Sequence, residues 1–454
     1  MKNDEAELVQ NADKRALHYL QNVEDRRVFP DASALAALSG FDEALPEVGL
    51  PAAETLALLD DLGSPATVVT NGPRYFGFVV GAALPVAAAA ERLMLAWDNG
   101  APLYLTSPTC AKVEEVAARW LLDILDLPRE SAVGFGTSAT ACSLTCLAAA
   151  RRAVLKKTGW NTDEDGLFGA PEIRVVVSER VHVTVLKALR ILGFGSSRIV
   201  LAAVDENGRI DVQRLPELTD MTIVCLQAGE VNTGEFDPFS EIISRAHDAG
   251  AWVHVDGAFG LWARSSEDLR HHTFGIEKAD SWAVDGHKWL NTPYDCAMAI
   301  CKDPALLSAA MNSDAVYAHG SSSAQKNLTL EFSRRARGVP VWAVLRTLGR
   351  QGVAALVKTH CDQATRLADS LRNAGFEVLN RVVLNQILVR GSSDEETKAI
   401  QAFAHDSGEV WFGMSAWGGR SAFRLSISSW RTADADITRL MDTLILARDS
   451  FRQR

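Results

Sequence analysis

The chain has 454 residues, 47% of them hydrophobic and 23% charged, so it can bury a large core and divide into two or three lobes. The formal net charge of −11 argues against a nucleic-acid or anionic-membrane partner, because either would repel the chain. The seven cysteines form no CxxC pair, so the sequence favours a reducing, cytoplasmic setting over a disulfide framework, and predicts no metal site.

The first 65 residues predict helices and connecting loops. Within them, the Pro- and Ala-containing stretch 46–53 could wrap over a partner subunit or form an exposed arm. The N-terminus carries no apolar leader, and the most apolar stretch, 76–90, contains Gly and Pro and falls short of a membrane span. The sequence therefore predicts neither targeting nor a membrane anchor.

From about residue 111 to residue 310, short β-branched runs alternate with helical patterns. Such alternation predicts an α/β fold with a mostly parallel sheet covered on both faces, in which ligands lie at the carboxyl ends of the strands. The expected helices include 183–192 and 239–249, and the expected buried strands are 175–177, 199–201, 222–226, 252–255 and 298–301.

After about residue 340, helical patterns dominate until short runs predict a small antiparallel sheet at 377–379, 386–390 and 423–428. The expected organisation is therefore an N-terminal helical segment (1–65), a large ligand-binding domain (66–340) and a small C-terminal α+β domain (341–454). These boundaries are soft by several residues.

A strand, a turn of small residues and a helix are predicted in VGFGTSATACSLTCLAAA, residues 133–150. Ser138, Ala139 and Thr140 lie at the turn and the helix start, where unpaired N–H groups and the helix dipole favour a phosphate. Plain helix capping is the more common role of such residues. His182, between a strand and a helix, could stack on a flat ring or be a structural histidine.

Asp256 ends the apolar run of AWVHVDGAFG, at the carboxyl end of a predicted strand. A buried carboxylate there is costly unless a cation faces it, and a protonated ring nitrogen is one such cation. A helix cap or a turn would explain this residue equally well if the segment stood alone.

Lys288 follows 32 residues later (288 − 256) in SWAVDGHKWLNTPYDCA, within largely apolar surroundings. A buried amine loses its charge more easily and becomes nucleophilic toward carbonyl compounds, as a Schiff-base lysine requires. His287 could donate to a phosphate oxygen and Asp285 could orient the neighbourhood. The alternative is a simple surface lysine. Gln227, in the segment 225–238, is expected to form a wall of the same site.

Together, the Asp of HVDGAFG, the HKW tripeptide, SAT before a helix and His182 resemble the group II PLP-dependent amino-acid decarboxylases. This family, which includes the aromatic-L-amino-acid, glutamate, diaminobutyrate and histidine decarboxylases, has the fold type I (aspartate-aminotransferase-like) architecture. The likeness covers most of the chain, including 72–85, 107–125, 333–349 and 423–432.

The resemblance implies a homodimer with active sites at the subunit interface, and pyridoxal 5′-phosphate (PLP) held by Lys288 as an aldimine. Asp256 would keep the ring nitrogen protonated, and the ring would lie between His182 and Ala258. Arg431 would match the family's arginine near the substrate carboxylate, with a surface ion pair as its alternative. The phosphate would be held by Ala139, Thr140 and His287, and Ser138 and Asp285 would be further cofactor-binding residues.

One departure concerns a loop tyrosine, which in many of these decarboxylases returns a proton to the substrate carbon. The corresponding stretch, 318–331, reads AHGSSSAQKNLTLE and holds no tyrosine. Tyr317 or His319 could substitute, while Gly320 and the serines after it suggest a lid. Relatives that lack this tyrosine can form aldehydes by oxidative deamination.

The leading prediction is decarboxylation of an L-amino acid to an amine and CO2. Phe78 and Tyr104, with Phe76, Trp97 and Leu103, favour an aromatic or apolar substrate side chain, although such residues are often core. The alternatives on the same fold are an aldehyde synthase, an aldolase-type C–C lyase and an aminotransferase. A catalytically silent binding protein is the alternative from another class.

Overall fold

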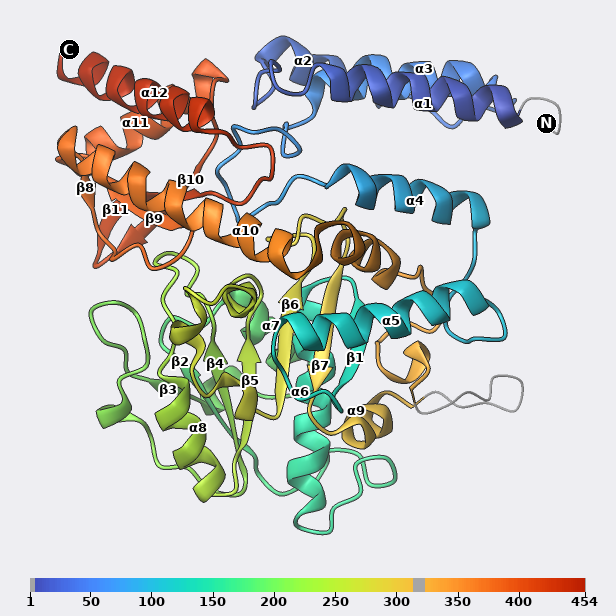
Figure 1. The fold of residues 1–454 in the computed structure, drawn as a ribbon, viewed down its shortest axis with the longest axis vertical. Coiled ribbons are helices and arrows are strands. Elements are labelled where there is room, and N and C mark those ends of the chain that lie inside the picture. Colours follow the sequence, from blue (N-terminus) through green and yellow to red (C-terminus); the bar gives the residue numbers. More distant parts are fainter. Residues whose placement is uncertain (1–4, 313–322, 454) are drawn as a thin grey trace. The chain divides into compact units, whose positions relative to one another are not determined.

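The computed structural model of the protein describes residues 5–312 and 323–453 (Figure 1). Its contacts divide the chain into two compact units. The sheet unit comprises Ala83–Thr365 and Asn380–Ile387, and the terminal unit comprises the chain up to Ala82, Arg366–Leu379 and the chain from Leu388 onward. The division into 1–65, 66–340 and 341–454 stays a prediction, because compactness alone does not define separately folding domains.

The sheet unit is built on a seven-stranded sheet in the order β1-β7-β6-β5-β4-β2-β3. Neighbouring strands are parallel from β3 to β6, whereas β7 is antiparallel to both β6 and β1. This mixed, mostly parallel α/β sheet confirms the predicted fold class. Its strands are β1 (Ala132–Gly136), β2 (Arg174–Ser178), β3 (Ile199–Ala202), β4 (Thr222–Gln227), β5 (Trp252–Asp256), β6 (Ser281–Asp285) and β7 (Ala297–Cys301).

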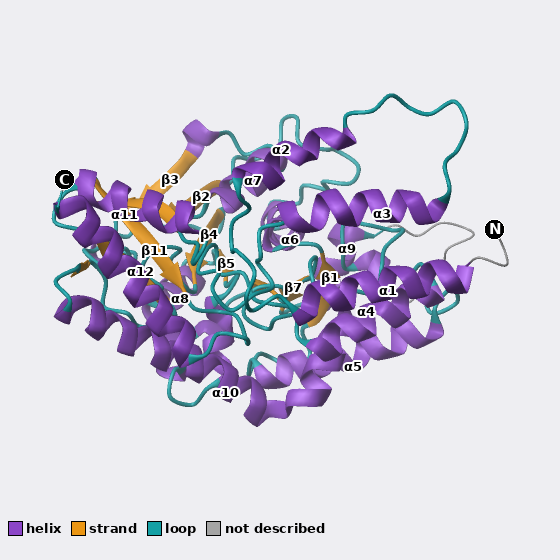
Figure 2. Ribbon diagram, turned by 90° about the horizontal axis from the view of Figure 1, so that it is seen from above, coloured by secondary structure: helices purple, strands orange, loops and turns teal. Residues whose placement is uncertain are grey.

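Helices cover this sheet. Helix α6 packs against β4 to β7 and against α7 and α9, α5 contacts β1, and α8 contacts β5 (Figure 2). The core between α6, α7 and the strands is aliphatic, with Leu147, Val177 and Leu189 fully buried. The helices are α4 (Pro85–Trp97), α5 (Pro108–Ile124), α6 (Ala139–Lys156), α7 (Val183–Ile191), α8 (Phe239–Asp248), α9 (Pro304–Met311) and α10 (Gly338–Asn373), whose last turns belong to the terminal unit.

The terminal unit holds the N-terminal helices α1 (Glu5–Gln21), α2 (Ala32–Ala37) and α3 (Ala52–Gly63), and residues 46–53 are exposed. The small sheet has the order β10-β11-β9-β8, and α11 packs on β10, β11 and α12. This antiparallel sheet confirms the C-terminal prediction. Its elements are β8 (Glu377–Val378), β9 (Gln386–Arg390), α11 (Asp394–Ser407), β10 (Gly413–Trp417), β11 (Arg420–Ser426) and α12 (Asp434–Arg452). No helix within the described ranges is long and apolar enough to cross a membrane.

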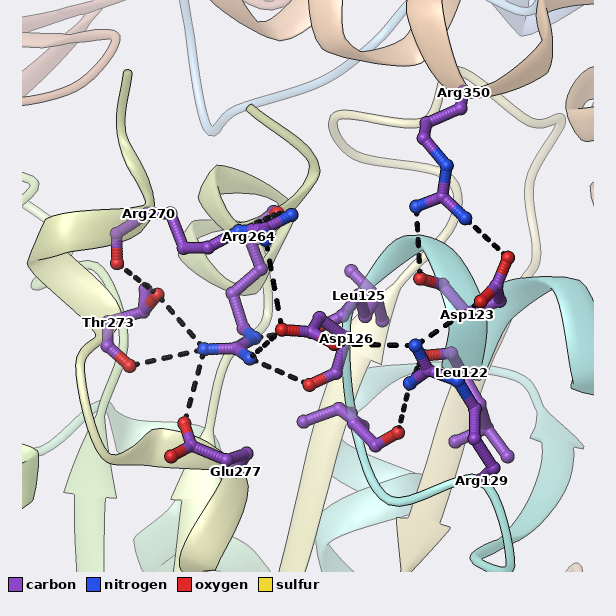
Figure 3. A network of polar contacts seen from close by, with 11 residues as sticks. Leu122, Asp123, Leu125, Asp126, Arg129, Arg264, Arg270, Thr273, Glu277 and Arg350 are labelled. Carbon is purple, nitrogen blue, oxygen red and sulfur yellow. Dashed lines mark hydrogen bonds and ion pairs between the residues drawn. The ribbon is translucent and has the colours of Figure 1, made fainter. Parts of the chain in front are cut away.

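Three short 3-10 helices follow β5, namely Gly260–Ser265, Arg270–Thr273 and Ile276–Lys278, and no hydrophobic period predicts them. A buried cation organises them instead (Figure 3). The guanidinium of Arg264 donates to the backbone oxygens of Leu125 at 2.5 Å, Asp126 at 2.7 Å and Thr273 at 3.3 Å. It also faces the carboxylates of Asp126 at 3.2 Å and Glu277 at 3.4 Å.

Replacing Arg264 by Met should lower the free energy of unfolding by about 3 kcal/mol, because buried backbone oxygens would lose their donor while the methionine keeps the stem. Urea denaturation measures the difference. Arg198→Met is the matched control, since Arg198 and its partner Glu172 are both exposed, and it should change stability by less than about 0.5 kcal/mol. Equal effects of the two substitutions would contradict a structural role for Arg264.

Candidate active site

The carboxyl ends of three neighbouring strands gather the polar residues of the site. Gln227 ends β4, Asp256 ends β5 and Asp285 ends β6. Gln227 is in register with Asp256, and Asp256 is in register with Ala283 of β6. Because these strands are parallel, their ends meet at one edge of the sheet, where ligands of such sheets bind.

Asp285 holds the lysine that follows it. One of its carboxylate oxygens lies 3.0 Å from Nζ of Lys288, and the other accepts a hydrogen bond of 2.6 Å from the backbone N–H of Ala139 at the start of α6. Asp285 is buried, and its backbone oxygen accepts from the indole of Trp262 at 3.0 Å. One carboxylate therefore joins the end of β6, the first turn of α6 and the amine.

His287 is fixed in one tautomer beside this group. Its Nδ1 accepts from the backbone N–H of Cys296 at 3.2 Å, so the proton of the neutral ring sits on Nε2, which lies 3.8 Å from Asp285. Burial lowers the pKa of His287, which keeps the ring neutral near pH 7. The ring stacks on Tyr294, with centroids 4.3 Å apart. His287 thus offers one N–H donor at the site.

Asp256 is a buried carboxylate. Its Oδ1 accepts from the N–H of Ala258 at 3.1 Å, and the described residues place no basic side chain at ion-pair distance from it. Burial raises the pKa of Asp256, and the charges of His182 and Lys288 and the hydrogen bond from Ala258 lower it by less. The ionised form is therefore under-compensated, and a cationic ligand group would stabilise it.

His182 lies between β2 and α7 and caps the start of helix α7. Its Nδ1 lies 2.7 Å from the hydroxyl and 3.4 Å from the backbone nitrogen of Thr184. This contact orients the ring, and the charge of His182 is among the causes that lower the pKa of Asp256. Capping and a ligand contact are compatible roles, because only the ring edge is used by the helix.

At the start of α6, Ser138 accepts from the N–H of Ala141 at 3.3 Å. The hydroxyl of Thr140 makes no hydrogen bond within the described part of the chain, and it is partly exposed. The N–H of Ala139, expected to face a phosphate, instead donates to Asp285. At the helix start, the hydroxyl of Thr140 and the helix macrodipole therefore stay available to an anion. The N–H of Ala139 instead binds Asp285, the carboxylate that contacts Lys288.

Lys288 departs from one expectation. Its side chain is 22% exposed rather than fully buried, although its amine contacts the buried carboxylate of Asp285. Tyr104 is exposed and lines a cavity of about 600 Å³ beside α5, whose lining does not include Lys288. The structure thus brings together Lys288, His182, Asp256, Ala258, Asp285, His287 and the start of α6, and does not add Tyr104 to them.

Phe78 and Arg431 belong to the terminal unit. Phe78 is exposed, adopts a left-handed backbone (φ 52°) and packs its ring 5.5 Å from that of Trp411. The guanidinium of Arg431 lies 4.5 Å from the ring of Trp430, and its buried Nε has no hydrogen-bond partner in the described structure. Arg431 therefore keeps an unused donor, whereas its contact with Glu24 is long, at 3.9 Å.

Sequence reasoning missed His360 and Tyr294, which contact the two residues that adjoin Lys288 along the chain. The indole of Trp289 donates to Nδ1 of His360 on α10 at 2.9 Å, which anchors the residue after the lysine. Tyr294 stacks on His287 and borders a cavity of about 750 Å³. Only chain proximity hinted at Tyr294, and nothing pointed to His360. The other residues that line this cavity are Asp98, Asn99, Gly100, Asp295, Ser333, Arg334, Arg335 and Arg337.

Comparison with known proteins agrees with this geometry. Residues 65–390 match the family model described as "Pyridoxal-dependent decarboxylase conserved domain". Tryptophan decarboxylase 1 of Oryza sativa subsp. japonica is 26% identical, over 90% of this chain and 87% of its own. The L-2,4-diaminobutyrate decarboxylase of Rhizobium meliloti is 28% identical (88% and 83%), and the phenylacetaldehyde synthase of Arabidopsis thaliana is 24% identical (92% and 90%).

Solved structures share the fold across the whole chain. The Oryza sativa TDC structure with PLP and tryptamine superposes with a TM-score of 0.91 at 22% identity, over 99% of both chains. Mouse CSAD in its apo form gives a TM-score of 0.89 at 19% identity, over 98% of this chain and 99% of that one. With the family model covering most of its length, this chain belongs to the PLP-dependent decarboxylase family.

Proposed function

We propose that this protein binds PLP through Lys288 and decarboxylates an L-amino acid to an amine and CO2. The observation that carries the proposal is the buried carboxylate of Asp256, which ends β5, lacks an ion-pair partner in the described structure and shares its strand edge with Lys288. A site of this kind needs a cationic ligand group on one side and a reactive carbonyl carbon on the other.

The donor and acceptor groups fit the cofactor. A protonated pyridine nitrogen supplies the cation that Asp256 lacks, and Asp256 would hold the proton on that nitrogen. The neutral His287 would donate from Nε2 to a phosphate oxygen, and the hydroxyls of Ser138 and Thr140 lie at the helix start, where an anion is favoured. Ala139 and Asp285 would act indirectly. The N–H of Ala139 donates to Asp285, and Asp285 contacts the amine of Lys288.

Bound PLP supplies an electron sink for the bond that breaks at the substrate Cα. His182 and Ala258 would hold the ring from its two faces, with His182 kept in place by Thr184. The amine of Lys288 would hold the aldehyde carbon and yield it to the substrate amine, while Asp285 keeps Nζ within reach. Catalytic roles are thus proposed for Lys288, Asp256 and His182.

For the substrate, we propose that Arg431 pairs with the carboxylate through its unused Nε, and that Phe78 favours an aromatic or apolar side chain; for Tyr104, which the described structure does not bring to Lys288, the same preference stays a prediction. Relatives named for tryptophan, tyrosine and aromatic L-amino acids support this class, although one relative is named for L-2,4-diaminobutyrate. A bidentate arginine pair would also select which Cα bond is broken, because it orients the carboxylate.

An aldehyde synthase is the second candidate. Residues 318–331 contain no tyrosine, and a relative is named phenylacetaldehyde synthase. Of this stretch, residues 318–322 lie outside the described residues, as do Tyr317 and His319, so the prediction of a lid or of a substitute donor there stays a prediction.

We further propose a homodimer. Helix α4 and the segment after it expose large apolar side chains, which marks an interaction surface; they are Leu93, Leu95, Trp97, Tyr104 and Leu105. A cytoplasmic location also stays a proposal, and the seven unpaired, buried thiols fit a reducing compartment.

Treating the holoprotein with borohydride should fix a pyridoxyl group on Lys288, detected by peptide mass spectrometry. Lys288→Ala should carry no adduct and release no CO2. Asp256→Asn should weaken PLP binding about 10-fold or more, since a charge-assisted contact is lost, and should lower the decarboxylation rate further. Asp268→Asn, at an exposed carboxylate, is the control with the same chemical change. An adduct on another lysine would refute the assignment.

An L-amino-acid panel decides the reaction. The expected products for aromatic substrates are CO2 and amine in equal amounts, with Lys288→Ala as the blank. Formation of aldehyde and peroxide without amine would show that the protein is an aldehyde synthase rather than a decarboxylase. Formation of a keto acid without CO2 would indicate an aminotransferase. A protein that stays colourless when PLP is added would favour a silent homologue.

The double variant Leu95→Glu/Leu105→Glu should raise the dimer dissociation constant by roughly 100-fold or more, because charges would be buried at the interface. Size-exclusion chromatography with light scattering measures the mass. Phe168→Glu, at an almost fully exposed phenylalanine, should leave it unchanged. A wild-type monomer that is active would contradict the proposal.

A further inference from the structure

Residues 380–387, which we call the strap, comprise most of the connection from β8 to β9 and the first two residues of β9. Their contacts nevertheless group them with the sheet unit, while the residues on either side belong to the terminal unit. Leu384, Asn385 and Gln386 are completely buried. The strap is therefore an integral part of the unit that holds Asp256.

The strap is fastened to the loop that follows β4, residues 229–237, which we call the clasp loop. The side chain of Asn380 donates to the backbone oxygen of Thr233 at 2.9 Å. Nε and Nη2 of Arg381 both lie 2.7 Å from Oε1 of Glu235, which is 4% exposed. Gly234 (φ 74°) packs so closely that an added Cβ would lie 3.2 Å from Leu384.

The clasp loop is internally bonded. The backbone oxygen of Glu235 accepts from the N–H groups of Gly229 at 3.2 Å and Glu230 at 2.7 Å. The carboxylate of Glu230 accepts from the N–H groups of Asn232 and Thr233, both at 2.7 Å. A displacement of Glu235 is therefore transmitted to Gly229 and Glu230 rather than absorbed within the loop.

From the clasp loop the contacts lead to Asp256. The N–H of Ala228 donates to the backbone oxygen of Asp256 at 2.8 Å. A Cβ on Gly260 would lie 2.2 Å from the oxygen of Ala228, and one on Gly229 would lie 2.8 Å from the ring of Phe259. The turns after β4 and β5 thus pack without space between them, so one cannot shift without the other.

The strap also holds an unfavourable backbone. Val382 has a φ of 52°, a left-handed conformation that β-branched residues rarely adopt. Such a conformation persists only where surrounding contacts over-determine it, and it is concentrated at functional sites. The ion pair of the preceding residue, Arg381, with Glu235 is one of these contacts.

We infer that Arg381 and Glu235 form a positioning pair that fixes Asp256 against the cofactor ring. Arg381 forms an ion pair with the carboxylate of Glu235, and the backbone oxygen of Glu235 accepts from the N–H of Gly229. The turn that contains Gly229 packs directly against the turn that follows Asp256. Neither residue touches the substrate, so both act through Asp256. The inference rests on the proposed role of Asp256, while the contacts themselves exist in the protein without cofactor.

Arg381→Met removes the charge and keeps the stem. It should weaken PLP binding to the apoprotein about 10-fold, because the Asp256 carboxylate loses its fixed orientation. Hydrogen exchange should accelerate in peptides covering 228–237 and 256–260, while 174–178 in β2 stays protected. Arg381→Lys should recover part of the affinity, since one charged donor remains. Arg198→Met, which breaks an exposed ion pair of the same unit, should change neither quantity.

Glu235→Gln tests the same pair from its other side, and the double variant Arg381→Met/Glu235→Gln should lose no more affinity than the worse single variant. Wild-type affinity and unchanged exchange at 256–260 in both single variants would overturn the inference. If hydrogen exchange in Arg381→Met is faster throughout the protein, the Glu235→Gln variant tests the inference instead, because this smaller change leaves the packing of the clasp loop intact. Failure of the wild type to bind PLP would reject the proposed function instead, and exchange at 256–260 in the apoprotein would still test the pair.

Discussion

The site depends on one buried carboxylate that serves two elements at once. Asp285 ends β6, accepts the first N–H of α6 from Ala139 and holds the amine of Lys288 at 3.0 Å. Helix α6 in turn packs on five strands of the sheet, so the amine is positioned by the most rigid part of the unit. A lysine side chain has four rotatable bonds, and without this contact its amine would sample a wide volume. Asp285 is therefore the constraint that makes Lys288 an anchor rather than a mobile cation.

Two carboxylates near one amine take different roles because their surroundings differ. Asp285 has a cation and a backbone donor in direct contact, whereas Asp256 has a single backbone donor and feels Lys288 and His182 only at a distance. Burial raises the pKa of Asp256, so a cationic ligand group would stabilise its ionised form. Environments that separate two titratable groups in this way are typical of sites where one group binds and the other orients. The proposed pairing of Asp256 with a ring nitrogen uses this difference.

The site residues proposed from the sequence lie at or near the ends of apolar strands. Asp256 ends β5 and Ser138 follows β1, both before small residues, and Lys288 follows β6; the mostly parallel sheet brings these strand ends to one edge. The β-strands were predictable for the same reason, since buried runs such as Val175–Val177 have no polar alternation. The hydrogen bond from the N–H of Ala139 to Asp285 could not be predicted. The sequence of a helix start looks the same whether its N–H groups face a phosphate or a carboxylate. Nor could the partial exposure of Lys288 be predicted, because it depends on the tertiary surroundings of the side chain.

The polar pairs that hold the site together lie beyond sequence reasoning for a physical reason. The partners Trp289 and His360 are 71 residues apart, Arg381 and Glu235 are 146 apart, and Arg334 and Glu114 are 220 apart. Read alone, the charged members resemble surface residues, and Glu235, Arg334 and Glu114 can be buried because a distant partner compensates their charge. Arg334 illustrates this: its bidentate contact with Glu114, at 2.7 and 2.8 Å, allows a guanidinium and a carboxylate to be almost completely buried. A local sequence pattern depends on residues that are adjacent along the chain. Buried polar side chains depend instead on partners that are distant in sequence. The candidate catalytic residues could therefore be proposed from local motifs, whereas the polar pairs that hold them in place could not.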